Sequence, residues 1–521
     1  MQAARIAQPP AWLLAAALAG LYLLLDPPSA DLAAQTYRTW LFHHAGFTIW
    51  DNGWYAGHHV PAYSVLFPPL SALLGPRVVG ALAAVGAAWA FERLAATTRP
   101  AGARPAALLF AVATAAPLVS GRLTFALGVA TAVAAALALA RGRLGLAALA
   151  GTATALASPV AAVFLALALV ARGAGHRDRR GLLTTLALLV ATLAPAGVLS
   201  LLFPEGGDFP FAASALWPSL GATLLVGVLL PRGERALRLG VGLYALLLVA
   251  AAALSTPMGG NAVRLGAVMA APVAALVLWP ARRGVLLALA PLLLYWQWTT
   301  PVNDWVHAAR DPSVRAPYYA GLLARLAAAG GPPFRLEIPF TDNHWESARV
   351  GTHVPLARGW ERQMDRKVNR LFYDGRPLTA ARYRRWLDEN AVRFVALPDA
   401  PLDPSAAAEA ALVRRGIPYL DEVWHDAHWR LFAVRDPAPL ARGARATALG
   451  IDSVTLDAPR AGRVALRVRW TPYWRLVAGR GCVVADGDWT ALQLTRPGPA
   501  RIRADFAPGR ARARTPRCTP R

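Results

Sequence analysis

Residues 26–70 read DPPSADLAAQTYRTWLFHHAGFTIWDNGWYAGHHVPAYSVLFPPL. This loop is dense in Asp, His, Trp and Tyr, and apolar stretches at 11–25 and 65–91 flank it. An apolar helix of about 20 residues crosses a bilayer. A long polar loop between two such helices predicts a membrane protein that presents functional groups at one face.

Apolar stretches continue up to residue 300 and then stop. The stretch 11–25 lacks a small-residue cleavage site before Asp26, so we expect an uncleaved first span rather than a signal peptide. The fold class is therefore a mainly α membrane bundle of about 11 transmembrane helices, followed by an exported α/β domain and a small C-terminal β-sandwich. The predicted spans are 11–25, 65–91, 105–120, 123–140, 144–157, 160–171, 181–203, 211–230, 239–255, 262–279 and 284–299.

Arginine clusters divide the connecting loops into two kinds. Basic loops near residues 93–104, 141–143, 172–180, 232–238 and 282–283 are expected to face the cytoplasm, and the alternate loops carry few basic residues. This alternation requires two helices in 144–171, broken at Ser158-Pro159, because proline disfavours a helical residue before it. One kinked helix is the alternative, and it would place the later Arg-rich loops outside the cytoplasm. The two-helix interpretation places loop 26–64 and the C-terminal part outside the cytoplasm.

Composition narrows the class of protein. Apolar residues make up 56% of the 521 residues, and the formal net charge is +24. Up to residue 300 the chain has 19 arginines and 8 acids, and this basic excess is concentrated in loops between apolar spans. It therefore indicates membrane topology and not a nucleic-acid partner. The remaining excess is spread through the mixed-charge part after residue 300. We expect a polytopic membrane domain at 1–300, an exported α/β domain at 301–440 and a β-sandwich-like tail with a basic end at 441–521. The two cysteines, Cys482 and Cys518, are expected to pair if the tail is exported.

Asp31 and Asp51 are the candidate catalytic acids of the loop. A carboxylate at a membrane interface can act as a general base. The structural alternatives are a helix cap at Asp31 or Ser29 and an Asx turn at Asp51. Trp54 and His58 are candidates for substrate binding. The paired histidines of the loop lack the spacing typical of a zinc site, so no metal ligand is assigned.

Two arginines at span ends are candidates for phosphate binding. Arg122 and Arg264 stand next to apolar stretches, where a charge usually faces the interior of a bundle or an aqueous cavity. Asn261 follows two glycines just before Arg264, at a helix start suited to an anion. The alternative is that these arginines snorkel to the lipid interface. In the exported domain, His344 and Glu346 follow a predicted strand and are candidates for acceptor binding; an internal ion-pair network is the alternative.

The chain resembles the GT-C superfamily of membrane glycosyltransferases, which use polyprenyl-phosphate sugars. The resemblance rests on the order of span, acidic outer loop, further spans and exported domain, and on Trp54-Tyr55-Ala56-Gly57, Tyr63 and Phe67-Pro68-Pro69. It implies a catalytic acid in the first outer loop, where Asp31 stands, and basic residues that bind the lipid phosphate. The paired-acid motif of the family is absent, so no cofactor is assigned and a divalent metal stays an open alternative.

The resemblance implies an inverting glycosyltransferase in the bacterial cell membrane, with its C-terminal domain outside the cytoplasm. Its expected partners are the lipid bilayer, a polyprenyl-phosphate-linked sugar and a cell-envelope glycan or glycolipid acceptor. Two other classes remain: a polytopic transporter or lipid flippase, and a non-catalytic cell-envelope scaffold. A transporter of the common kinds has internal repeats, and none is seen in the sequence. A scaffold has no need for acids and span-end arginines that converge.

Overall fold

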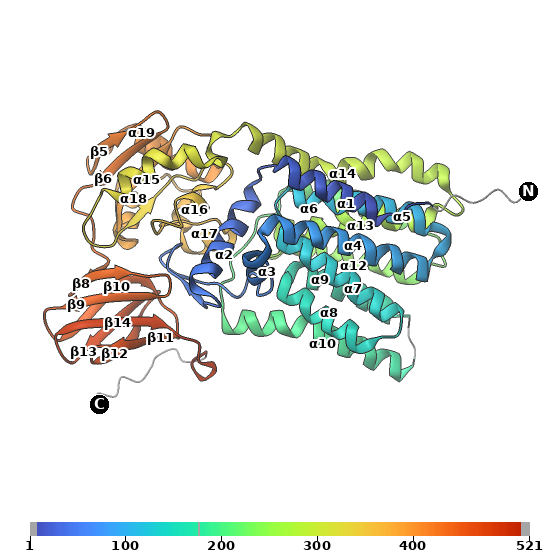
Figure 1. Cartoon of the computed structure of the whole chain (residues 1–521), viewed down its shortest axis with the longest axis horizontal. Coiled ribbons are helices and arrows are strands. Elements are labelled where there is room, and N and C mark those ends of the chain that lie inside the picture. Colours follow the sequence, from blue (N-terminus) through green and yellow to red (C-terminus); the bar gives the residue numbers. More distant parts are fainter. Residues whose placement is uncertain (1–7, 176–177, 512–521) are drawn as a thin grey trace, which may run out of the picture. The chain divides into compact units, whose positions relative to one another are not determined.

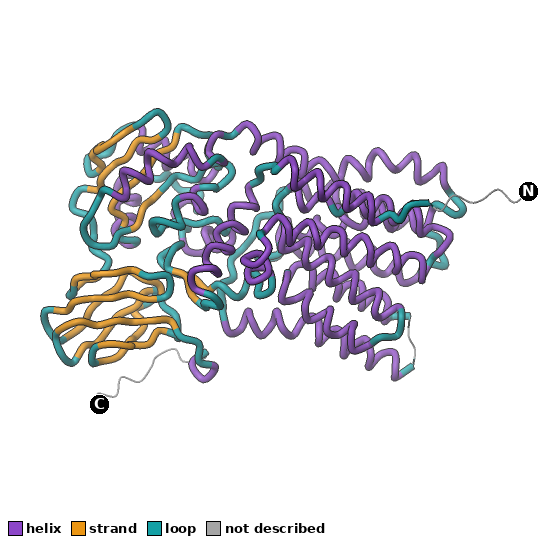
Figure 2. The backbone as a smooth tube through the Cα atoms, in the orientation of Figure 1, coloured by secondary structure: helices purple, strands orange, loops and turns teal. Residues whose placement is uncertain are grey.

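The computed structural model describes residues 8–175 and 178–511. These residues form two compact units, and Figure 1 traces the order of their elements. The first unit comprises residues up to 35, 63–198 and 208–307, and the second comprises 36–62, 199–207 and 308 onward. Every strand in the described part of the chain belongs to the second unit. Figure 2 draws these strands in orange.

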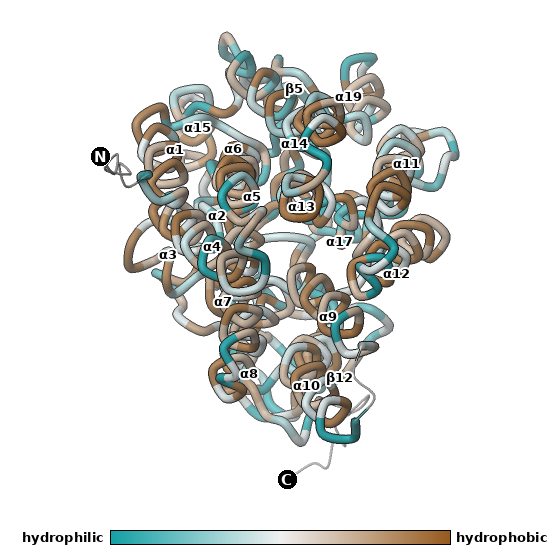
Figure 3. The backbone as a smooth tube through the Cα atoms, turned by 90° about the vertical axis from the view of Figure 1, so that its right-hand side faces the viewer, coloured by the Kyte–Doolittle hydropathy of each residue, from teal (hydrophilic) through white to brown (hydrophobic). Residues whose placement is uncertain are grey.

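The first unit is a bundle of apolar helices. Each of the eleven predicted spans is helical, and helix α2 (Ala30–Ala45) begins in this unit and continues into the second. Figure 3 shows the apolar character of most of these helices. Their bounds are α1 Trp12–Leu25, α3 Phe67–Leu74, α4 Pro76–Thr98, α5 Pro100–Ala113, α6 Ala115–Val119, α7 Leu123–Ala140, α8 Leu144–Ala157, α9 Pro159–Gly173, α10 Arg179–Leu202, α11 Ala213–Leu229, α12 Arg235–Ala253, α13 Val263–Leu278 and α14 Arg283–Arg310.

Among the described residues, seven helical segments are long and apolar enough to cross a membrane, or up to eight if the bent pair α1–α2 is one span. The chain is therefore a multi-pass membrane protein. Helices α8, α9 and α11 are apolar but shorter, so the count of eleven crossings stays a prediction.

Close helix packing holds this bundle together. Phe91 of α4 stacks on Phe110 of α5 with ring centroids 4.2 Å apart. Gly102 of α5 packs against the backbone of Leu276 in α13, where a Cβ atom would collide with a carbonyl oxygen. Small residues allow such close approach in membranes, where van der Waals packing replaces the hydrophobic effect between helices.

The predicted break in 144–171 is confirmed. Helix α8 ends at Ala157 and α9 begins at Pro159. Ser158 between them is extended, with φ −157° and ψ 110°, and its side chain accepts a hydrogen bond from the Ala161 amide. The chain therefore forms two helices here and not one kinked helix.

The second unit contains an α/β part. Its sheet has the order β3-β4-β6-β5, in which only β3 and β4 are parallel. Tyr383, Trp386 and Leu387 of α18 pack with residues of α19 and the sheet in one hydrophobic core. The bounds are α15 Ala320–Ala327, β3 Arg335–Glu337, α16 Glu346–Arg349, α17 Arg362–Val368, α18 Ala380–Glu389, β4 Val392–Pro398, α19 Ala407–Arg414, β5 Leu420–His425 and β6 Trp429–Val434.

The segment 313–329 does not form a single helix, although its pattern is typical of an amphipathic one. Two short 3-10 turns, Pro312–Val314 and Ala316–Tyr319, precede α15. Pro317 explains the difference, because a proline inside a helix removes a backbone hydrogen bond and clashes with the preceding turn, which can break the helix. Asp311 caps the first 3-10 turn by accepting a hydrogen bond from the Ser313 amide.

Two four-stranded antiparallel sheets follow, β12-β13-β10-β7 and β11-β14-β9-β8. Val454, Ile502, Leu466 and Leu492 from the two sheets meet in one hydrophobic core. Cys482 lies on β12, whereas Cys518 lies outside the described residues, so their predicted pairing stays a prediction. The strands are β7 Ala441–Arg442, β8 Arg445–Leu449, β9 Ser453–Ala458, β10 Gly462–Arg469, β11 Trp474–Ala478, β12 Gly481–Asp486, β13 Trp489–Leu494 and β14 Gly498–Ala504.

The polar loop is an integral part of this second unit. It forms a short hairpin of β1 (Trp50–Asp51) and β2 (His58–His59). Trp50 enters the core of the two sheets. The Asn52 amide donates to the Ile451 carbonyl at 2.7 Å, and the Leu356 amide donates to the Gly53 carbonyl at 2.8 Å. The hairpin therefore joins both the α/β part and the two C-terminal sheets.

Segment 199–207 packs into the same unit. The Tyr473 hydroxyl donates to the Leu202 carbonyl at 2.8 Å, and His59 Nδ1 lies 2.8 Å from Glu205 Oε1. Segments that pack together in one polar unit lie on the same side of a membrane. An even number of crossings must therefore separate loop 36–62 from segment 199–207, which agrees with two helices in 144–171.

Candidate functional site

Asp31 and Arg122 form an ion pair in the first unit. Asp31 is the second residue of α2, and its Oδ2 lies 3.0 Å from Arg122 Nε. The helix begins at Ala30, so the capping position falls on Ser29 and the Asp31 carboxylate is engaged by the guanidinium. Both side chains are about one quarter exposed, at 22% and 24%.

The turn between α6 and α7 brings Arg122 to this position. Gly121 has a φ of +71°, which favours glycine. A Cβ atom at Gly121 would collide with Ser29 Oγ and lie 2.6 Å from the Leu32 amide nitrogen. The absence of a side chain at Gly121 therefore lets the turn approach the start of α2.

Arg264 reaches the same carboxylate from α13. Its Nη2 lies 4.0 Å from Asp31 Oδ2, and its guanidinium lies 5.6 Å from the ring centroid of Phe125. The side chain is 21% exposed. Asn261 lies in the 3-10 turn Gly259–Ala262 before this helix, and its side chain donates to the Pro257 carbonyl at 3.3 Å. Arg264 therefore faces the acid, whereas Asn261 closes its own turn.

Asp304 is a fourth member of this cluster, and the sequence interpretation did not include it. Its Oδ2 lies 3.6 Å from Arg122 Nη2, and it is 33% exposed. Helix α14 continues to Arg310, well beyond the predicted end of the span at 299. The sequence does contain a signal for Asp304. It is an acid that closely follows a Trp-rich apolar stretch, where a membrane interface is expected.

The cluster brings together two guanidinium groups and two carboxylates from three helices and the turn before α7. Partial burial lowers the local dielectric, so each interaction is stronger than in water. Guanidinium groups bind carboxylates and phosphates with the same planar set of donors. The arginines can therefore exchange a carboxylate for a phosphate without a change in the type of contact.

Asp51 has a different environment. It is completely buried in the second unit, where it accepts hydrogen bonds from the Tyr37 hydroxyl at 2.9 Å and the Gly53 amide at 2.8 Å. The Gly53 contact is the Asx turn that we considered as an alternative. Burial raises the pKa of Asp51, although His58, 3.8 Å away, acts in the opposite direction.

Trp54 and His58 lie beside Asp51 and are enclosed. Trp54 is 0% exposed and His58 is 3% exposed. The Trp54 ring stacks on Tyr37 with centroids 4.1 Å apart, and its Nε1 donates to the Ser347 carbonyl at 3.2 Å. These side chains therefore present no open surface to an acceptor in this structure.

His344 and Glu346 belong to a second buried network. Nδ1 of His344 lies 3.9 Å from Glu346, and its Nε2 lies 3.4 Å from Asp403, which also pairs with Arg362. Both predicted residues are almost fully buried. The pKa of Asp403 is lowered because hydrogen bonds to His344 and Arg362 outweigh the effect of burial. This arrangement matches the internal ion-pair alternative.

Within residues 8–175 and 178–511, no three or more His, Cys, Asp or Glu side chains are arranged to hold a metal ion. The cluster at Asp31 contains two acids and two arginines, and the two arginines can bind an anion.

Comparisons with known proteins give a likeness in structure alone. No protein-family model matches the chain, and no curated protein matches it in sequence. Two cryo-EM structures of a mutant arabinofuranosyltransferase AftD from mycobacteria are similar to it, with 17% and 16% identity and TM-scores of 0.48 and 0.46. They align over 97% and 93% of this chain. The chain spans only 60% and 58% of the AftD chains.

Proposed function

We propose that this protein is an integral membrane glycosyltransferase that transfers a sugar from a polyprenyl-phosphate donor to a cell-envelope acceptor. The observation that supports the proposal most directly is the convergence of Asp31, Arg122 and Arg264. A lipid-linked donor moves in the plane of the membrane. The groups that act on it therefore belong at the ends of apolar helices, where these three residues lie.

In the proposed reaction, Asp31 is the general base. It accepts the proton of an acceptor hydroxyl while that oxygen attacks the anomeric carbon of the donor sugar. The bond between the anomeric carbon and the phosphate oxygen breaks, and polyprenyl phosphate leaves with the electron pair. Attack on the face opposite the phosphate inverts the anomeric configuration.

The two arginines stabilise the phosphate that leaves. Positively charged groups aimed at developing negative charge are among the strongest contributors to catalysis. Arg264 is the more available cation, because its 4.0 Å contact with Asp31 is longer than the 3.0 Å contact of Arg122. When the donor phosphate engages Arg264 and then Arg122, it replaces the Asp31 carboxylate and leaves that carboxylate free to take the acceptor proton.

Asp304 contributes by positioning Arg122. Its carboxylate lies 3.6 Å from Arg122 Nη2, whereas Asp31 contacts a different nitrogen, Nε. Arg122 therefore keeps one acidic partner when Asp31 is released. We place the reaction outside the cytoplasm, because the Arg-poor loops predict that side for loop 26–64.

Replacement of the base tests the proposal. In membranes supplied with radiolabelled polyprenyl-phosphate sugars, Asp31→Asn is expected to abolish transfer while expression and donor binding stay near those of the parent protein. Asp26→Asn is the matched control, because Asp26 lies in the same loop and pairs with Arg77 at 2.6 Å but stands 73% exposed. Transfer by the Asp31→Asn variant at the parent rate would refute the role of Asp31.

A further inference from the structure

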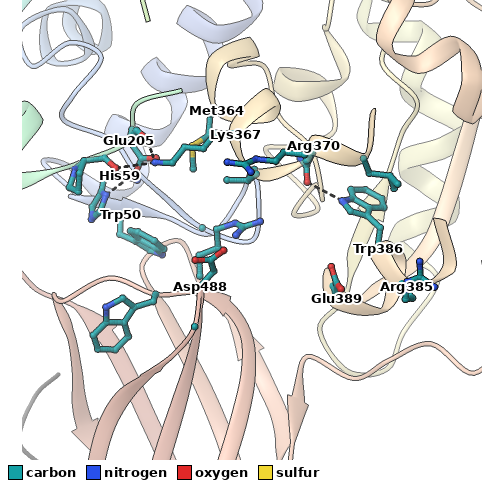
Figure 4. Close-up of a pocket in the computed structure, with 18 of the residues that line it drawn as sticks. Trp50, His59, Glu205, Met364, Lys367, Arg370, Arg385, Trp386, Glu389 and Asp488 are labelled. Carbon is teal, nitrogen blue, oxygen red and sulfur yellow. Dashed lines mark hydrogen bonds and ion pairs between the residues drawn. The ribbon is translucent and has the colours of Figure 1, made fainter. Parts of the chain in front are cut away.

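The second unit contains a cavity of about 780 Å³ that the proposed reaction does not use. Segments of the polar loop, of 199–207, of the α/β part and of the two C-terminal sheets all contribute to its lining. Figure 4 shows Lys367 and Arg370 on one side of the space and Trp50 and Asp488 on the other. The volume falls in the range of cavities that hold small organic ligands.

Positive charge dominates the lining. Five basic side chains line the cavity, together with three carboxylates: Lys367, Arg370, Arg382, Arg385 and Arg469, with Glu205, Glu389 and Asp488. The three acids do not neutralise the five cations, so the cavity attracts an anion.

Several of the charges are already committed to neighbours. The Glu205 carboxylate contacts His59 Nδ1 at 2.8 Å, and its pKa is lowered because the hydrogen bond with His59 outweighs burial. Arg382 pairs with Asp374, and Arg469 Nε donates to the Tyr55 carbonyl at 2.9 Å. These contacts fix the wall of the cavity.

Arg370 and Arg385 differ from the others. Both are exposed, and within the described ranges neither guanidinium makes a hydrogen bond or an ion pair, whereas Lys367 Nζ donates to the Glu205 carbonyl. Each guanidinium offers five donors in a planar fork that fits a carboxylate or a phosphate. The two arginines are therefore the cations of this cavity that are available to a ligand.

Indole rings accompany these cations. Trp50, Trp386 and Trp470 line the cavity, and Trp470 is half-buried, so part of its surface remains open. The Trp386 Nε1 donates to Asn369 Oδ1 at 3.0 Å, which holds the ring in place. A sugar ring combines apolar C–H faces with hydroxyl groups, and a wall of indoles, amides and charges offers both kinds of contact.

We infer that this cavity is a binding site for an acidic oligosaccharide, one that carries carboxylate or phosphate groups. Its charged groups would contact Arg370 and Arg385, and a sugar ring would lie against the open part of Trp470. A flat membrane surface does not enter a concave site of this kind, which favours a soluble glycan segment over lipid head groups. This inference concerns binding and does not depend on the transfer reaction.

Titration calorimetry on the purified full-length protein tests the inference with three defined probes. Tetragalacturonate and phosphorylated maltotetraose are the acidic probes, and maltotetraose is the neutral one. We expect at least one acidic probe to bind more tightly than maltotetraose, and the preferred probe distinguishes a carboxylate ligand from a phosphate ligand. Absence of binding by both acidic probes at millimolar concentration, or equal affinity for the neutral probe, would overturn the inference.

A charge-matched pair of variants locates the site. The double variant Arg370→Gln with Arg385→Gln is expected to weaken the acidic probe about tenfold or more, because two charge-assisted contacts are lost. The control is Arg414→Gln with Arg415→Gln, which removes the same charge from an exposed position outside the cavity lining. An equal loss of affinity in both double variants would show that only overall charge matters and would also overturn the inference.

Discussion

The carboxylate of Asp31 lies 3.0 Å from the Nε atom of Arg122, although 91 residues separate them in the chain. The contact joins the first turn of α2 to the residue before α7. Arg264 reaches the same oxygen from a third helix. A carboxylate shared by two cations can be released by any ligand that binds those cations, and this exchange is the basis of the first two predictions.

Arg264→Ala is expected to weaken donor binding about ten- to a hundredfold, because a charge-assisted contact to phosphate is lost. Binding of a labelled polyprenyl-phosphate sugar to the purified protein measures the change. Arg77→Ala is the matched control: Arg77 is also the second residue of its helix, but it pairs with Asp26. An unchanged donor affinity in the Arg264 variant would remove this arginine from the phosphate site.

Asp304→Asn is expected to lower the maximal transfer rate about tenfold with little change in donor affinity, because Arg122 loses the partner that positions it. Steady-state kinetics with the labelled donor separates the two effects. Asp304→Glu should restore most of the rate, since it restores the charge. If the Asn variant instead loses donor affinity at an unchanged rate, Asp304 does not act through positioning.

Membrane topology gives a third prediction, which requires no substrate. Reporter fusions after residues 142, 258 and 440 should read inside, outside and outside the cytoplasm. Arginines flank the first position, the loop at 256–261 has no basic residue, and two further predicted spans separate that loop from residue 440. A cytoplasmic signal at 440 would overturn both the topology and the side on which we place the reaction.

The buried carboxyl of Glu337 predicts a pH-dependent stability. Burial, with the nearby Glu409, raises the pKa of Glu337 well above its usual value. Neither carboxyl oxygen of Glu337 accepts a hydrogen bond from a described residue, so no hydrogen bond stabilises its charged form. A folded-state pKa above the unfolded one means that the contribution to stability is complete below the usual glutamate pKa and is lost as the pH rises through the folded-state value.

Glu337→Gln removes this titration and keeps the shape. The difference in melting temperature between Glu337→Gln and the parent protein should therefore change in favour of the variant between about pH 5 and pH 9. Thermal unfolding in detergent, monitored by tryptophan fluorescence, measures it. A constant difference across that range would show that Glu337 titrates at its ordinary value when the protein is folded.

Local sequence signals predicted most of the helical part correctly. Hydropathy located helices in all eleven expected spans, and Ser158-Pro159 indicated the break between α8 and α9. The convergence of Asp31 with Arg122 and Arg264 could also be expected, because a charged side chain at the end of an apolar helix usually faces the interior of the bundle. These features depend on short stretches of chain and on the membrane as a solvent.

Other features depend on distant partners and could not be predicted in the same way. Asp51, Trp54 and His58 belong to a polar loop, and such a loop is expected to be exposed. In the structure all three side chains are buried. Gly359 explains part of the difference, because its missing side chain lets Trp54 pack within 2.6 Å of where a Cβ atom would stand. Strand β5 (Leu420–His425) was missed because only its first residue is buried, so it lacks the alternation that indicates a strand.

The hairpin of loop 36–62 has a consequence for how the protein is made. Asn52 donates a hydrogen bond to the carbonyl of Gly450, which the ribosome adds 398 residues later, and Trp50 fills a core whose strands are synthesised last. All of the apolar helices are therefore translated before the hairpin can acquire its partners. A chain that ends before these sheets therefore leaves Trp50 without its hydrophobic core and Asn52 without its hydrogen-bond partner.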